Sequence, residues 1–271
     1  MTEKRRNKGK TESPDAGQVA DAIVMALHKQ RNPVRARAVQ RYFSEDIVAL
    51  GVAAPALRRL VAKRVKPLRG AWMLDDAIEC CDLLVKEPQI EVRTAGILVL
   101  AAFKRDFTPA LMDRACKWLR KRLDNWALVD ALSGTVLSPL LAKHPEVAAT
   151  HSSPLQVWSK DKCLWVRRAA LVTLVPFARR GQLLDLSYRL ARDRLGDGEP
   201  LMHKAIGWLL REAGRTDAKR LRQFLLRQGP AIPRISLRYA IEHFSAKDRA
   251  EVMIATRRKS ARRANPRLDK G

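Results

Sequence analysis

The feature that most constrains the fold is a pattern of apolar residues at helical spacing, which recurs along almost the whole chain. Ile206, Leu209 and Leu210 are one instance. Residues three and four positions apart lie on one face of an α-helix. Alternating patterns flanked by turn pairs, which are typical of strands, are absent. The sequence therefore predicts an all-α protein with helices of about 10 to 18 residues.

Proline and glycine residues divide this pattern into separate helices. We expect helices to end near Glu87-Pro88, Thr108-Pro109, Ser138-Pro139, Gly181, Gly196-Asp197-Gly198 and Gly229-Pro230.

The helices also repeat. Arg93, Asp130, Arg168 and Lys204 fall in phase, at steps of 37, 38 and 36 residues, and most of them precede a run of small apolar residues. This period is typical of stacked helix pairs of the HEAT or armadillo kind. Such pairs bury a continuous core and leave one helix of each pair along a concave face. We therefore expect a HEAT-like helical repeat solenoid, an α-α superhelix, with polar residues in a row on its concave face.

The chain is strongly basic. Its 53 Lys and Arg residues against 28 Asp and Glu give a net charge of +25. The residues 1–14 and 256–271 contribute +3 and +6, so the body between them retains +16. A basic excess spread through a folded body favours a polyanionic partner, because neutralised phosphates release counterions. The alternative is a host whose proteins are generally basic. We expect the concave face to bind DNA.

The two ends have no helical period. We expect disordered basic tails at residues 1–15 and 255–271, flanking a repeat domain at residues 16–254. No segment approaches the ~20 apolar residues of a membrane helix, and the first residues lack the apolar stretch of a secretory signal.

The cysteines and the missing motifs bear on cofactors. Cys80, Cys81, Cys116 and Cys163 form no C-x-x-C pair, and we interpret them as reduced, mostly buried thiols of a cytoplasmic protein. Phosphate-binding loops, dinucleotide fingerprints, nucleophile elbows and zinc-protease motifs are absent. We therefore expect no metal and no other cofactor.

Four residues form a candidate site. Trp126 and Asp130 are four apart, hence on one helix face, and the repeat phase brings Arg168 and Trp208 to the same concavity. A carboxylate among phosphates suggests a cationic target, such as the oxocarbenium-like sugar formed when a glycosidic bond breaks. Arg168 would keep Asp130 ionised. The alternatives are that the tryptophans belong to the core and that Asp130 pairs with Arg168 only to join neighbouring repeats.

At these residues the chain resembles the AlkD family of DNA alkylation-repair glycosylases, which are built from HEAT-like repeats. The resemblance runs from about Val34 to Phe244 and rests on five elements. They are Tyr42-Phe43, Leu50-Gly51-Val52 with Pro55 and Leu57-Arg58, Asn125-Trp126-x-x-Val129-Asp130, Trp165-Val166-Arg167-Arg168-Ala169, and Lys204-Ala205-Ile206-Gly207-Trp208-Leu209-Leu210-Arg211-Glu212. The last element is the most specific. Ala127 departs from the family's pattern, which often has an acidic residue there.

The resemblance implies hydrolysis of the N-glycosidic bond of cationic 3-methyladenine- and 7-methylguanine-type purines. It gives Asp130 the role of the catalytic carboxylate, Trp126 and Trp208 contacts to the deoxyribose, and Arg168 the place of the family's arginine. We expect a monomeric, monofunctional enzyme acting on double-stranded DNA with alkylated bases. Basic side chains of the helices would contact phosphates, namely Arg93, Arg167, Lys204, Arg211, Arg234 and Arg238. The alternatives are a non-catalytic module that binds bent, branched or damaged DNA, and a scaffold for acidic proteins.

Overall fold

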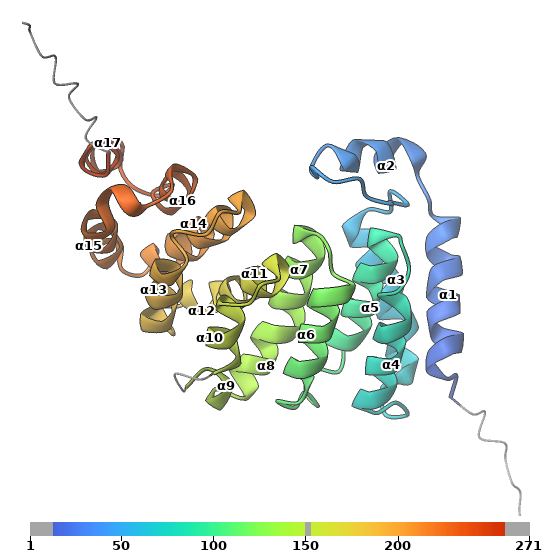
Figure 1. Cartoon of the computed structure of the whole chain (residues 1–271). Helices are drawn as coiled ribbons and strands as arrows, with labels where there is room; N and C mark the ends of the chain where they lie inside the picture. The colour runs from blue at the N-terminus through green and yellow to red at the C-terminus, as the bar shows by residue number, and fades with distance from the viewer. Residues whose placement is uncertain (1–12, 150–152, 258–271) are drawn as a thin grey trace, which may run out of the picture. The chain divides into compact units, whose positions relative to one another are not determined.

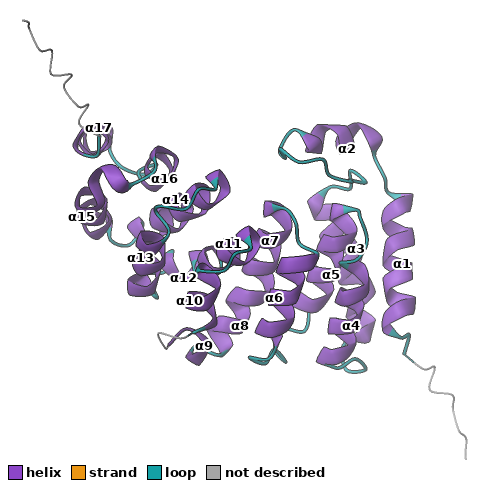
Figure 2. Ribbon diagram, in the orientation of Figure 1, coloured by secondary structure: helices purple, strands orange, loops and turns teal. Residues whose placement is uncertain are grey.

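The structure is a computed structural model that describes residues 13–149 and 153–257. Within these ranges the secondary structure is helical, and the only β structure is two isolated bridges, Val48–Gln89 and Arg69–Trp72 (Figures 1 and 2). The predicted all-α fold is therefore confirmed. The chain forms two compact units, one ending at Thr173 and one beginning at Leu174. The predicted tails at residues 1–15 and 255–271 lie almost entirely outside the described residues.

The first unit consists of short antiparallel helices packed side by side (Figure 1). Its α-helices are α1 (Ala16–Lys29), α2 (Pro33–Gln40), α3 (Ala54–Val65), α4 (Leu74–Leu84), α5 (Ile90–Ala101), α6 (Leu111–Lys121), α7 (Trp126–Leu132), α8 (Ser138–Lys143), α9 (Glu146–Ala149), α10 (Pro154–Ser159) and α11 (Leu164–Val172). Helix α4 packs on α5 and α10 packs on α11. The in-phase residues Arg93, Asp130 and Arg168 lie on α5, α7 and α11, which follow α4, α6 and α10 as second helices of successive pairs.

The second unit continues the pattern of helix pairs. Its helices are α12 (Val175–Ala178), α13 (Leu184–Asp193), α14 (Pro200–Gly214), α15 (Ala218–Gln228), α16 (Arg234–Ala240) and α17 (Ala246–Ala255). Gly207 allows α14 and α16 to approach closely, because a Cβ there would lie 2.5 Å from Cβ of Tyr239 and 2.7 Å from the carbonyl oxygen of Ser236. Lys204, the next in-phase residue, lies on α14. The predicted domain at residues 16–254 stays a prediction, since the described helices form two units.

Helix α5 forms the centre of the first unit. It contacts α1, α3, α4 and α7, and apolar side chains are buried on most of its circumference. Gly96 permits close packing on α4, because a Cβ there would lie 2.9 Å from Cβ of Leu84. Burial of this helix ties the early part of the chain to α7.

The predicted helix ends are confirmed except at Ser138-Pro139. There the chain continues from α7 through a π-helical turn, Ser133–Leu137, into α8. A π turn inserts an extra residue, which makes room for the proline ring that would otherwise collide with the preceding turn. The Ser138 N–H donates to the Ser133 carbonyl, and the Ser138 hydroxyl lies 2.8 Å from the carbonyls of Ser133 and Thr173. A proline therefore does not end this helix.

The expected helix length was wrong for several elements. Helices α9 and α12 have four residues each, and α7 has seven. Packing against neighbours stabilises such short helices, which would not form alone.

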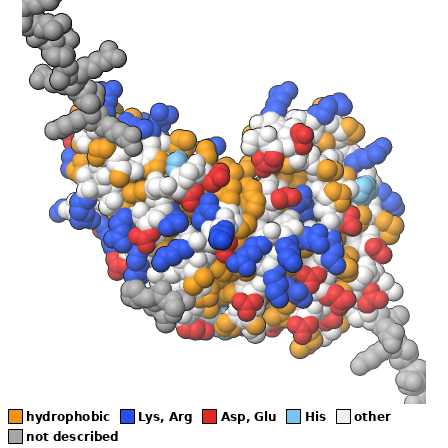
Figure 3. All heavy atoms as spheres, viewed as in Figure 1, with side chains coloured by type: hydrophobic (Ala, Val, Ile, Leu, Met, Phe, Trp, Pro, Cys, Tyr) orange, Lys and Arg blue, Asp and Glu red, His pale blue; other side chains and the backbone are white. Residues whose placement is uncertain are grey.

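None of the described helices is long and apolar enough to cross a membrane. Lys and Arg side chains gather over α6 in Figure 3, and its exposed basic residues are Arg114, Lys117, Arg120 and Lys121.

Candidate functional site

Trp126 and Asp130 lie on α7, whose start is fixed by Asn125. The Asn125 side chain is buried and accepts a hydrogen bond from the Leu128 N–H at 3.1 Å. An asparagine in this position satisfies a backbone donor that the first helical turn leaves free. Trp126 is therefore the first residue of the helix, and Asp130 follows one turn later on the same face.

Asp130 forms a two-pronged ion pair with Arg168 of α11. Arg168 Nε donates to Asp130 Oδ1 and Nη2 donates to Oδ2, both at 2.9 Å. The Arg168 side chain is 6% exposed and that of Asp130 is 18% exposed, so water reaches the carboxylate and hardly reaches the arginine. Burial raises the pKa of Asp130 above its usual value, while the charge and hydrogen bonds of Arg168 oppose the rise. The ion pair expected between these two residues is therefore present, and it joins α7 to α11.

Trp126 is held by a loop that comes from far earlier in the chain. Its ring stacks on Phe43, with ring centroids 5.2 Å apart and planes 19° apart. Its Nε1 donates to the Tyr42 carbonyl at 3.3 Å. One face and one edge of the indole are thus engaged, and the ring is still only partly buried. The Tyr42 side chain is 74% exposed beside it.

This loop is fastened by the buried carboxylate of Glu91 on α5. Its Oε2 accepts the Leu50 N–H at 2.9 Å, and its Oε1 accepts the N–H groups of Gly51 and Val52 at 2.7 and 3.2 Å. Gly51 has φ +78°, and a Cβ there would lie 2.1 Å from the Asn32 carbonyl oxygen, so only glycine is accommodated. The early G-V element of the sequence therefore positions the loop against Trp126.

Sequence reasoning missed Phe43, Tyr42 and Glu91 as site residues. The signal that could have found Tyr42 and Phe43 was the Y-F element itself, whereas no motif pointed to Glu91. The contact of Tyr42 with Trp126 spans more than eighty positions in the sequence. Periodicity does not reveal a contact at that separation.

In the first unit, the two predicted phosphate contacts, Arg93 and Arg167, have acceptors inside the protein. Arg93 is 8% exposed, and its Nη1 donates to Asp124 Oδ1 at 2.7 Å and to the Arg122 carbonyl at 2.9 Å. Arg167 Nη1 donates to the backbone carbonyls of residues 161 and 162. Both arginines thus help to fix the turns before α7 and α11, and their contact with DNA stays a prediction.

In the second unit, Trp208, Lys204 and Arg211 lie on α14, and Arg234 and Arg238 lie on α16. Trp208 is partly buried, whereas Lys204 and Arg238 are exposed. Lys204 and Arg238 are each the fifth residue of their helices, the place that Asp130 and Arg168 occupy in α7 and α11.

Arg234 has acceptors near the end of α17. Its Nη1 donates to the Thr256 hydroxyl at 3.1 Å. The predicted roles of Trp208, Lys204, Arg211, Arg234 and Arg238 stay predictions.

The comparisons with known proteins agree on the kind of protein. The sequence profile of the family described as DNA alkylation repair enzyme matches residues 23–244. The chain belongs to this family. A solved structure titled "Predicted DNA alkylation repair enzyme from Enterococcus faecalis" is similar with a TM-score of 0.71, covering 80% of this chain and 98% of that one at 18% identity. No curated protein matches the chain significantly.

Membership in the DNA alkylation repair enzyme family shows that the chain acts in the repair of alkylation damage to DNA. The likeness to the Enterococcus faecalis protein shows the fold, in agreement with the predicted helical repeats. The matched range includes every candidate residue named above, from Tyr42 to Arg238.

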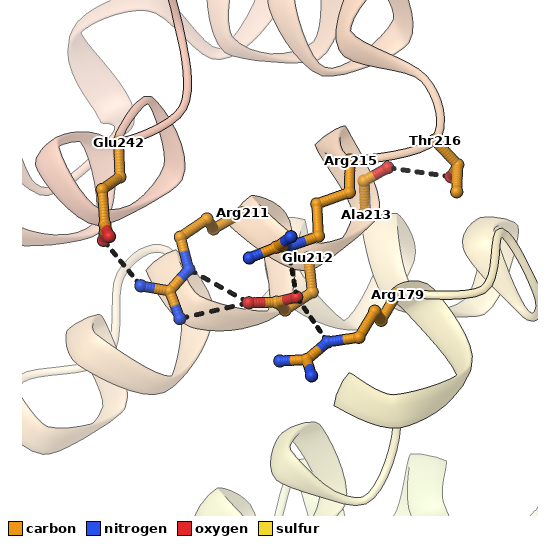
Figure 4. Close-up of polar contacts among 7 residues, drawn as sticks. All are labelled: Arg179, Arg211, Glu212, Ala213, Arg215, Thr216 and Glu242. Atoms are coloured by element: carbon orange, nitrogen blue, oxygen red, sulfur yellow. Dashed lines mark hydrogen bonds and ion pairs between the residues drawn. The ribbon is translucent and has the colours of Figure 1, made fainter.

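The family motif on α14 ends in Glu212, the centre of a cluster of arginines (Figure 4). The Glu212 side chain is fully buried and binds Arg179, Arg211 and Arg215. Burial alone would raise the pKa of Glu212, but the three arginines together lower it below its usual value. This cluster joins α12 to the end of α14.

The described residues contain no group of three His, Cys, Asp or Glu side chains arranged to hold a metal ion. Cys80 and Cys81 are buried, whereas Cys116 and Cys163 are partly buried, and all four are free thiols. Burial raises the pKa of Cys80 to about 12, so it has little thiolate character at neutral pH.

Proposed function

We propose that the protein is a monofunctional DNA glycosylase, which hydrolyses the N-glycosidic bond of cationic purines of the 3-methyladenine and 7-methylguanine type. An alkylated purine already carries positive charge and leaves readily. The enzyme then needs chiefly to stabilise the oxocarbenium-like sugar and to direct water to it. It would act on double-stranded DNA as a monomer, without a metal or nucleotide cofactor.

The observation that carries this proposal is the position of the Asp130 carboxylate. It is mostly buried, partly open to water and one helical turn from Trp126. Arg168 holds it in one orientation and favours its charged form. Each carboxylate oxygen has a second lone pair beyond the one that Arg168 uses. The carboxylate can therefore face a cationic sugar or accept a proton from water while it stays in place.

Trp126 supplies the second element of the proposed chemistry. Stacking on Phe43 and the hydrogen bond to Tyr42 fix the indole, so little conformational freedom is lost when substrate binds. The electron-rich ring attracts a cationic base or sugar. We propose that Trp126 contacts the deoxyribose at the lesion. The same role for Trp208 rests on the resemblance and is tested by its own substitution to alanine.

Basic side chains would bind the DNA backbone with little sequence preference. Exposed Lys204 and Arg238 are suited to this, because both are accessible. For Arg93, Arg167, Arg211 and Arg234 we propose that a phosphate joins the internal acceptors that already fix each guanidinium. A guanidinium carries five donors, so one side chain can serve both.

Base release tests the proposal. Duplex DNA containing 7-methylguanine is incubated with the wild type, with Asp130→Asn and with the control Asp113→Asn, and both free base and strand breaks are measured. Asp113 is an exposed aspartate on α6 and belongs to none of the proposed contacts. We expect the wild type and the control to release base and leave an intact strand. Asp130→Asn should be slower by on the order of 10²- to 10³-fold.

The alternative function, a non-catalytic module that binds damaged DNA, predicts that the wild type releases no base. It also predicts unchanged DNA binding by Asp130→Asn. Under the glycosylase proposal, DNA binding by Asp130→Asn survives or tightens, because a negative charge leaves the site. Equal rates of base release from wild type and Asp130→Asn would refute the role of Asp130.

A further inference from the structure

The Glu212 cluster contains more positive charge than its own structure needs. Arg179 Nε and Arg215 Nε both lie 2.8 Å from Glu212 Oε2, and Arg211 Nη2 lies 3.1 Å from Oε1 (Figure 4). A fully buried carboxylate requires compensation, because burial of an unpaired charge is very unfavourable. One or two guanidinium groups would supply it. Three converge here, from the end of α12 and from α14.

The three arginines differ in how far their charge is satisfied. Arg211 Nη1 reaches a second acid, Glu242 Oε2, at 2.6 Å. Arg179 and Arg215 have only Glu212 among the described residues, and each uses only its Nε atom. The three arginines, Glu212 and Glu242 therefore carry a net charge of +1.

The unused donors of Arg179 and Arg215 are accessible. Their side chains are 56% and 45% exposed, although their Nε atoms bind a fully buried carboxylate. Both Nε atoms contact the same oxygen, so the two guanidinium groups converge on one carboxylate and their terminal nitrogens are left for another acceptor (Figure 4). Two neighbouring cations repel each other, and a bound anion would relieve that repulsion.

The backbone keeps the two arginines in this arrangement. Gly181 has φ +73° directly after Arg179 and Arg180, and its Cα side packs on Thr216, where an added Cβ would lie 3.3 Å from the Thr216 hydroxyl oxygen. The end of α12 is thereby held beside the end of α14. Planar guanidinium forks held in this way match the oxygens of a phosphate group and lose little freedom on binding it.

We propose that Arg179 and Arg215, oriented by Glu212, form a binding site for a phosphodiester group of the DNA backbone. The inference rests on the proposed function for its choice of DNA as the phosphate source. Neither arginine belongs to the motif residues for which a DNA contact was predicted. The site lies wholly within the second unit, so it is tested independently of Asp130.

The test is the salt dependence of binding to undamaged duplex DNA, measured by fluorescence anisotropy. The variant Arg179→Gln with Arg215→Gln is compared with the wild type and with a control, Arg192→Gln with Arg222→Gln. The control arginines are 56% and 42% exposed and pair with other acids, so the control removes the same charge from similarly accessible places. Loss of one phosphate contact should reduce the slope of log K against log salt by about 0.9.

We expect the site variant, and not the control, to show this reduced slope and a weaker affinity at every salt concentration. Equal slopes for the two double variants would overturn the proposal. If the glutamine variant does not fold, Arg179→Lys with Arg215→Lys keeps the charges next to Glu212 but removes the forks. That variant should keep the wild-type slope and still bind more weakly, and wild-type affinity would contradict the proposal.

Inorganic phosphate distinguishes the two sources of the anion. Inorganic phosphate at constant ionic strength could raise the melting temperature of the wild type while the site variant shows the same slope of log K against log salt for DNA binding as the control. In that case the site binds a free anion and the DNA proposal is wrong. Base release reports separately on the proposed function. A reduced slope in the site variant without base release by the wild type would support the phosphate site and refute the glycosylase. Base release together with an unchanged slope would support the glycosylase and refute the phosphate site.

Discussion

Replacement of Glu91 by glutamine should loosen the loop that holds Trp126. The Glu91 carboxylate accepts hydrogen bonds from the backbone N–H groups of Leu50, Gly51 and Val52. All three partners are donors, so a donor group on residue 91 would find no acceptor among them. Glutamine has the same shape but presents one oxygen and one NH₂ group. If its oxygen keeps the two bonds to Gly51 and Val52, its NH₂ group faces the Leu50 N–H, and a buried donor loses its acceptor.

The expected cost follows from that lost acceptor. A buried donor without a partner destabilises its surroundings by about 1–3 kcal/mol. Because 1.4 kcal/mol corresponds to a factor of ten, opening of the loop should become roughly 5- to 140-fold more frequent. The loss should be local, since the loop is attached to α5 through this carboxylate, whereas the apolar core of the first unit is unchanged.

Amide hydrogen exchange of the segment 44–53, followed by mass spectrometry, measures this opening. Glu79→Gln is the matched control, because Glu79 is an exposed glutamate on the neighbouring α4 with no side-chain hydrogen bond among the described residues. Exchange in Glu91→Gln that stays within twofold of this control would refute the role of Glu91 as the fastener of the loop.

Three further changes have defined outcomes. Phe43→Ala removes a ring stacked on Trp126, which is worth about 0.5–1.5 kcal/mol, and should lower kcat/KM for base release by roughly 2- to 13-fold; an unchanged value would contradict the contact. Glu212 has a lowered pKa, so the stability that its charge contributes is present above the usual glutamate pKa of 4.5 and is lost as the pH falls through the pKa of the folded protein. Melting temperatures between pH 3 and 6 should therefore depend less on pH in Glu212→Gln than in the wild type. Equal pH profiles of the two proteins would contradict this. Gly207→Ala should lower the free energy of unfolding by about 1–3 kcal/mol, because its Cβ would lie 2.5 Å from that of Tyr239, and urea denaturation with no shift would show that the helices separate freely.

The sequence predicted the contact between Asp130 and Arg168 because it follows from the repeat. Both are the fifth residue of the second helix in successive pairs, so stacking brings them together. The same logic located Lys204 on its helix. It failed at Ser138-Pro139, because a π turn is not visible in a pattern of apolar residues and turn signals.

The sequence could not predict which arginines already have partners. Arg93 and Lys204 are in phase in the repeat, yet Arg93 is 8% exposed and bound to Asp124, whereas Lys204 is exposed. Whether a cation is accessible depends on carbonyl and carboxylate groups that turns place next to it. The contact between Phe43 and Trp126 likewise depends on the path of a loop fastened by Glu91, and a helical period contains no information about that path.

The central claim, that the Asp130 carboxylate acts in breaking the glycosidic bond, is tested most directly by the pH dependence of single-turnover base release. Free 7-methylguanine is measured for the wild type and Asp130→Asn across the acidic range, after subtraction of the rate without protein. The ionised carboxylate is required, and burial raises the pKa of Asp130. The wild-type rate should therefore fall on acidification at a pH above the usual aspartate pKa of 3.8, while Asp130→Asn should be slow, by on the order of 10²- to 10³-fold at neutral pH, and lack that inflection. The same rate and pH profile in both proteins would contradict the claim.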